Sequence, residues 1–60
     1  MSMRDLSKAA TNRNADECFA LLKGGLSEAS PRLEELSLKY ENGIIDDEQL
    51  CEAIEEWVNF

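Results

Sequence analysis

The sequence predicts an all-α fold of three short helices, arranged as an open bundle or as a clamp around a partner. Apolar residues recur at spacings of three and four residues, which is typical of amphipathic helices. The single proline and the three glycines fall at the expected helix boundaries. A chain of 60 residues is too short for a large core, so we expect marginal stability unless a partner covers apolar surface.

The first helix is expected over residues 3–23, and it ends at Gly24 and Gly25. Residues 1–14 contain few large apolar side chains, so this front part is expected to fray. We interpret the glycine pair as the end of the helix; close approach of another backbone is the alternative. The apolar residues that follow the helical period are Ala15, Cys18, Phe19, Leu22 and Leu26.

The second helix is expected over residues 31–42. Ser30 is its N-cap, because a side-chain oxygen there accepts a hydrogen bond from a free backbone N–H. Pro31 takes the first helical position, where no donor is needed. Gly43 follows the helix and can adopt the left-handed conformation that ends it. The stripe expected to face inward consists of Leu33, Leu36, Ser37 and Tyr40.

The third helix, over residues 47–58, has the clearest local signal. Asp46 and Gln49 form a capping box, and Ile45 before the cap can pack onto Leu50 as a hydrophobic staple. One apolar ridge then repeats at helical spacing, formed by Leu50, Ala53, Ile54 and Trp57.

Composition excludes several classes of function. Because the chain has no histidine, it has no Ser-His-Asp or Cys-His nucleophile pair and no histidine ligand for a metal. We therefore expect no enzyme activity, catalytic residue, metal or cofactor. The 13 acidic residues exceed the 6 basic ones and give a net charge of −7, which opposes nucleic-acid binding because that affinity comes from Lys and Arg.

Location and redox state are also predicted from composition. The opening segment is charged throughout, so we expect neither a signal peptide nor a membrane span and place the chain in the cytoplasm. Cys18 and Cys51 are too far apart for a Cys-x-x-Cys motif. Both are predicted to be small apolar residues, buried or half-buried, in a reducing compartment.

The acidic residues concentrate in the second part of the chain. Residues 1–23 hold 4 basic and 3 acidic groups, whereas residues 24–60 hold 2 basic and 10 acidic groups. One interpretation is a solvated helix surface that keeps a small protein soluble. The other is a docking face for a basic partner, since opposite potentials steer two proteins together.

The signals follow each other in a definite order over roughly residues 13–58: a helix that ends in glycine and leucine, a Ser-Pro turn, a short helix that ends in glycine, and a capped helix. The residues that define it are Ala20 to Leu26, Ser30-Pro31, Leu33, Leu36, Tyr40 to Ile44, Asp47 to Leu50, and Ile54. This order resembles the antitoxins of Fic toxins, of the VbhA type.

The resemblance implies binding to a Fic-domain AMP transferase, an enzyme that moves AMP from ATP onto hydroxyl side chains. In that family an inhibitory glutamate pairs with an arginine that otherwise binds the ATP γ-phosphate. Here Gly25 keeps the final glycine of the motif, whereas Ala20 stands at its Ser/Thr position and Gly24 at its glutamate position. We expect a complex in which the partner binds ATP and is not fully inhibited.

The resemblance also implies contact residues. Phe19, Leu22 and Leu26 would dock the first helix near the nucleotide cleft of the partner. The later helices would pack together or onto the partner through Leu33, Leu36, Tyr40, Ile54 and Trp57.

Two rival hypotheses come from other classes. The alternative function is an acidic helical adaptor or immunity-type protein that binds a basic protein partner through its second and third helices. That hypothesis predicts an affinity that falls steeply with salt. The other is a homodimer in which the ridge of Leu50, Ile54 and Trp57 self-associates.

Overall fold

The first predicted helix is split in two. In the computed structural model, which describes residues 3–59, α1 spans Met3–Thr11 and α2 spans Ala15–Lys23. The prediction of three helices, with one over residues 3–23, is therefore wrong. The described residues form four α-helices and no strand, which confirms the all-α class. The predicted single domain also included residues 1–2 and 60, which lie outside the described residues.

Three local hydrogen bonds mark the split. The backbone N–H groups of Arg13 and Asn14 donate to the carbonyls of Ala10 and Ala9, at 3.0 and 2.9 Å, which is the Schellman pattern that ends a helix. Arg13 lies in the left-handed region with a φ of 56°. The Asn14 side chain then accepts from the Glu17 N–H at 3.2 Å and caps the next helix.

The remaining helices begin where the sequence predicts. The Ser30 hydroxyl accepts from the Arg32 N–H at 3.2 Å and caps α3 (Pro31–Glu41). Asp46 and Gln49 form both hydrogen bonds of the capping box, at 2.8 and 3.0 Å, and α4 spans Asp47–Val58. A 3-10 turn, η1, joins α2 to α3 over Leu26–Ala29.

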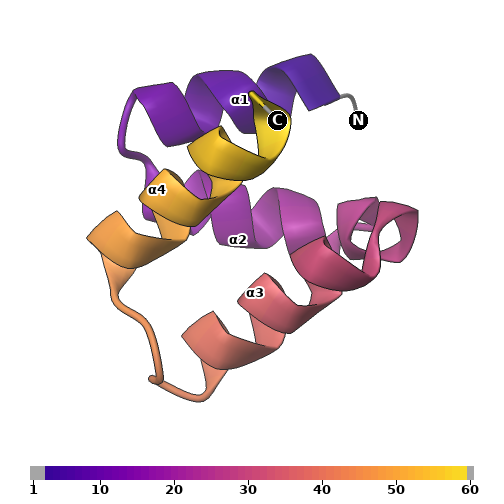
Figure 1. Cartoon of the computed structure of the whole chain (residues 1–60), viewed down its shortest axis with the longest axis vertical. Coiled ribbons are helices and arrows are strands. Elements are labelled where there is room, and N and C mark those ends of the chain that lie inside the picture. Colours follow the sequence, from indigo (N-terminus) through magenta and orange to yellow (C-terminus); the bar gives the residue numbers. More distant parts are fainter. Residues whose placement is uncertain (1–2, 60) are drawn as a thin grey trace.

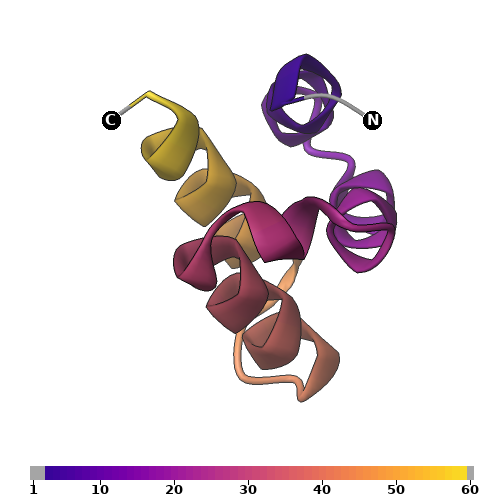
Figure 2. The ribbon, with the colours of Figure 1, turned by 90° about the vertical axis from the view of Figure 1, so that its right-hand side faces the viewer.

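The four helices form two antiparallel pairs, α1 with α2 and α3 with α4 (Figure 1). Figure 2 shows α1 and α2 nearly end-on while α3 and α4 run obliquely, so the pairs cross each other. The most extensive contact between helices joins α1 to α4, and the first and last helices thus close the domain. Its radius of gyration is 9.7 Å, close to the value of about 10 Å expected for a folded chain of this length.

Every α-helix contributes to one core. The stretch that we expected to fray supplies three of its side chains, those of Leu6, Ala9 and Ala10, and Leu6 has no exposed surface. Cys18 and Cys51 are also buried, which confirms the burial predicted for them. Among the described residues, no buried side-chain nitrogen or oxygen lacks a hydrogen-bond partner. The buried apolar residues are Leu6, Ala9, Ala10, Ala15, Cys18, Leu22, Leu33, Leu36, Leu50, Cys51 and Ile54.

Candidate functional site

Four of the eight residues predicted to contact a partner lie in the core of this chain. Leu22, Leu33 and Ile54 have no exposed surface, and Leu36 is 4% exposed. The other four pack against the edge of the core and keep part of their surface exposed: Phe19, Leu26, Tyr40 and Trp57. In this fold a partner can meet the second group but not the first, so contact through the second group stays a prediction.

The three positions of the inhibitory motif lie at the C-terminal end of α2, and all are exposed. Gly24 is the C-cap, and its N–H donates to the Ala20 carbonyl at 2.9 Å. Its φ of −79° is accessible to any residue. Gly25 has a φ of 128°, which favours glycine. The second glycine therefore has a conformational role in turning the chain into η1.

Phe19 and Tyr40 belong to a cluster that joins α2 to α3 and α4. Their ring centroids lie 5.1 Å apart at a tilt of 53°, and the Lys23 Nζ lies 5.8 Å from the centroid of the Phe19 ring. Lys23 also forms an ion pair with Glu41 at 3.4 Å. The Tyr40 hydroxyl donates to Asp47 at 2.6 Å, and this hydrogen bond is the main cause that raises the pKa of Tyr40 to about 12.

Three exposed glutamates on α4 form a surface that we call the α4 acidic stripe: Glu48, Glu52 and Glu56. Their spacing of four residues places them along one side of the helix. The ion pairs of the described residues use other carboxylates, those of Glu35, Glu41 and Glu55. Like charges at this spacing cost about 0.2–0.5 kcal/mol per pair. The spacing is visible in the sequence but was not among the predicted binding residues.

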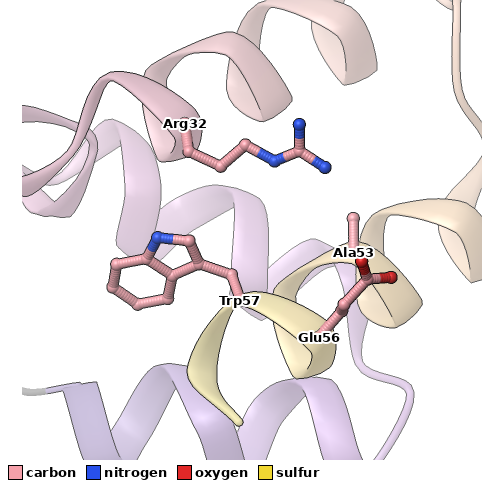
Figure 3. A pocket seen from close by; sticks show the side chains of 4 residues that line it. All are labelled: Arg32, Ala53, Glu56 and Trp57. Atoms are coloured by element: carbon pink, nitrogen blue, oxygen red, sulfur yellow. The ribbon is translucent and has the colours of Figure 1, made fainter. Parts of the chain in front are cut away.

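A pocket of about 540 Å³ lies between the start of α3 and the C-terminal half of α4, and we call it the α3/α4 pocket. In Figure 3 the Trp57 indole, the Arg32 guanidinium and the Glu56 carboxylate surround the same space, which Ala53 also lines. Neither charged group takes part in the ion pairs found among residues 3–59. Only Trp57 was predicted, because Arg32 reaches the pocket from a different helix.

The two cysteines are neighbours across the α2–α4 contact. Both thiols are free and buried, and each influences the other. Burial, followed by the Cys51 thiol, raises the pKa of Cys18 to about 12. Burial also raises the pKa of Cys51. Both sulfurs are therefore protonated at neutral pH, and this pair is a poor nucleophile in the folded protein.

The described residues contain neither a metal-binding cluster nor a membrane-spanning helix. Among residues 3–59, no group of three or more Asp, Glu, Cys or His side chains is placed to hold a metal ion. Within the same residues, no helix has the length and apolar character needed to cross a membrane.

Comparisons with protein-family models, with curated proteins and with solved structures found no match for this chain. The resemblance to antitoxins of Fic toxins therefore stays a prediction.

Proposed function

We propose that this chain is a small, non-catalytic binding domain whose partner is a protein with a basic surface. The observation that carries the proposal is the α4 acidic stripe, which is exposed and has no cation of this chain paired with it among the described residues. Its location is the cytoplasm, where thiols such as Cys18 and Cys51 stay reduced.

Charge supports this assignment. With a net charge of −7, the domain attracts a basic protein from a distance, and an array of carboxylates at one helix face gives the encounter a direction. Like-charge neighbours destabilise a helix. The acidic stripe lowers the stability of the free domain, and cations of a partner would offset this loss in a complex. This supports a binding function.

The core supports a preformed domain rather than a chain that folds on its partner. Side chains from all four helices are buried together, so recognition can use the surface without opening the core. Rigid surfaces bind with a lower loss of conformational entropy than disordered ones.

A lysine-rich peptide is a suitable probe, and its affinity can be measured by calorimetry at two salt concentrations. The variant Glu48→Gln/Glu52→Gln is expected to bind the peptide about fivefold more weakly than the control Asp16→Asn/Glu28→Gln. Both variants lose two charges at exposed positions. Equal affinities would show that net charge alone attracts the peptide, and would contradict the assignment to the stripe.

A second candidate is regulation of a Fic-domain AMP transferase, as the sequence resemblance implies. The backbone at the motif supports it: Gly24 has a φ of −79°, which accommodates glutamate, whereas Gly25 has a φ of 128°, which suits the final glycine. Ala20 and Gly24 are both exposed, so a partner can reach them.

The test is the AMP-transfer activity of a Fic-domain enzyme that copurifies with this chain. Gly24→Glu is expected to lower this activity, because the new carboxylate competes with the ATP γ-phosphate for arginine. Gly24→Gln has nearly the same size and no charge, so it is the matched control. Failure of any Fic-domain enzyme to copurify, or equal activity with both variants, would overturn this candidate.

A further inference from the structure

We propose that the α3/α4 pocket is a binding site for a small zwitterion, an α-amino acid with an apolar side chain. This inference goes beyond the proposed protein-binding function and needs no partner protein. Two oppositely charged side chains and an aromatic ring line the same pocket, and this combination carries the inference. The lining residues are Arg32, Glu56, Ala53 and Trp57.

The charged groups come from different helices and do not pair with each other. Arg32 lies in the first turn of α3, directly after the N-cap and proline, and Glu56 lies near the end of α4. No ion pair joins them in the described structure, where the ion pairs belong to Arg13, Lys23 and Lys39. Each therefore has free hydrogen-bonding capacity toward a ligand between them.

The two groups suit the two ends of an amino-acid backbone. The Arg32 guanidinium presents paired N–H donors that match a carboxylate, and the N-terminal end of α3 adds a partial positive charge on the same side. The Glu56 carboxylate accepts hydrogen bonds from an ammonium group. A ligand with both charges on one carbon satisfies both residues at once.

The opposite signs also disfavour ligands that carry a single charge. A ligand with only a positive charge is repelled by Arg32, and one with only a negative charge is repelled by Glu56. A zwitterion has a favourable contact with each. The pocket is thus selective for charge arrangement rather than for net charge.

The remaining lining suits an apolar side chain. The Trp57 ring packs against the core and presents an aromatic surface to the pocket. The Ala53 methyl adds apolar area and takes up little space. The volume of about 540 Å³ is within the range of about 300–1,000 Å³ found for small-molecule sites. Because the ring is large and flat, aromatic and branched aliphatic side chains gain most.

Trp57 is the only tryptophan of the chain, so its fluorescence reports directly on this pocket. Titration with L-phenylalanine is expected to change the emission until the site is saturated. Phenylalaninamide lacks the carboxylate and N-acetylphenylalanine lacks the ammonium. Each is expected to bind at least about fivefold more weakly, because it loses one charged contact.

Variants locate the site. Arg32→Gln and Glu56→Gln are each expected to weaken phenylalanine binding about fivefold. Both residues are exposed, so the fold is expected to tolerate the changes. Asp16→Asn removes an equal charge at an exposed position of α2, outside the pocket lining, and is expected to leave the affinity unchanged.

Three results would overturn the proposal. The first is emission that does not saturate with phenylalanine. The second is equal affinity for phenylalanine and for its amide or its N-acetyl derivative. This would show that the pocket does not recognise one of the two charged groups of the amino acid. The third is unchanged affinity in both the Arg32→Gln and the Glu56→Gln variants.

Discussion

The ends of α1 and α3 have the same backbone hydrogen bonds but different residues at the left-handed position. The two N–H groups that close the helix donate at 3.0 and 2.9 Å in α1, and at 3.1 and 2.8 Å in α3. The left-handed residue is Arg13 with a φ of 56° in α1, and Gly43 with a φ of 74° in α3. Glycine adopts this conformation freely, whereas other residues pay about 1–2 kcal/mol.

The difference shows that the two ends have different causes. Gly43 ends α3 through its own backbone preference. Arg13 remains left-handed because its surroundings hold it there: α1 packs on α4, and the Arg13 guanidinium pairs with Glu55 of α4 at 3.0 Å. Tertiary contacts therefore impose the end of α1, and local sequence determines the end of α3.

The largest expected effect comes from Leu6→Ala, which removes a fully buried side chain from α1. We expect it to lower the free energy of unfolding by about 2–5 kcal/mol, most of the stability of so small a domain. Lys8→Ala is the control, because Lys8 is exposed on the same helix. Chemical denaturation followed by circular dichroism measures both. If the two variants were equally stable, α1 would not be held by the core.

Gly43→Ala should destabilise the domain by about 1–2 kcal/mol. The added Cβ meets nothing within 4 Å, so the loss comes from the backbone conformation. Gly24→Ala is the matched control, because Gly24 has a φ of −79°. At that position alanine is expected to be neutral or slightly stabilising, since it restricts the unfolded chain. Thermal melting of both variants checks the opposite signs, and a loss of equal size in each would refute the assignment.

At Arg13 the comparison is between two substitutions that both remove the ion pair with Glu55. Arg13→Gly is expected to be more stable than Arg13→Ala by about 1 kcal/mol, because only glycine relieves the left-handed backbone. Denaturant titration resolves this difference. Equal stability would mean that the backbone leaves the left-handed region when the arginine is lost.

The smallest expected effect on folding stability at neutral pH concerns the hydroxyl of Tyr40, the only tyrosine of the chain. The folded state raises its pKa from 10.0 to about 12, so the protonated hydroxyl contributes stability that is lost as pH rises through this range. Ultraviolet absorbance of the phenolate measures the titration. Asp47→Asn is expected to lower the pKa toward the ordinary value, because Asp47 accepts the hydrogen bond. An unchanged titration would exclude that hydrogen bond as the cause.

Sequence patterns were sufficient for α3 and α4 because their boundaries depend on residues close in the chain. Ser30 and the Asp46–Gln49 box start the helices through hydrogen bonds that span two or three residues. The break after α1 has the same hydrogen-bond geometry but lacks glycine, so a search for glycine and proline missed it. Asn14, three residues before Glu17, was the available signal for a new helix.

The candidate site was predictable only in part, because it combines helices that are distant in sequence. Trp57 follows from the apolar ridge of α4, and the spacing of Glu48, Glu52 and Glu56 follows from the helical period. No local pattern places Arg32 and Trp57 around the same pocket. That placement requires the turn between α3 and α4, which reverses the chain and sets the first turn of one helix opposite the last turns of the other (Figure 1).

The reactivity of the neighbouring thiols of Cys18 and Cys51 reports how often this fold opens locally. Both are buried and protonated at neutral pH, so an alkylating reagent reacts with them only after α2 and α4 separate. The rate of alkylation thus measures how often α2 and α4 separate, as hydrogen exchange measures the opening of backbone amides. A ligand or a partner that holds α4 in place would lower this rate, so its binding could be detected through the thiols without an added label.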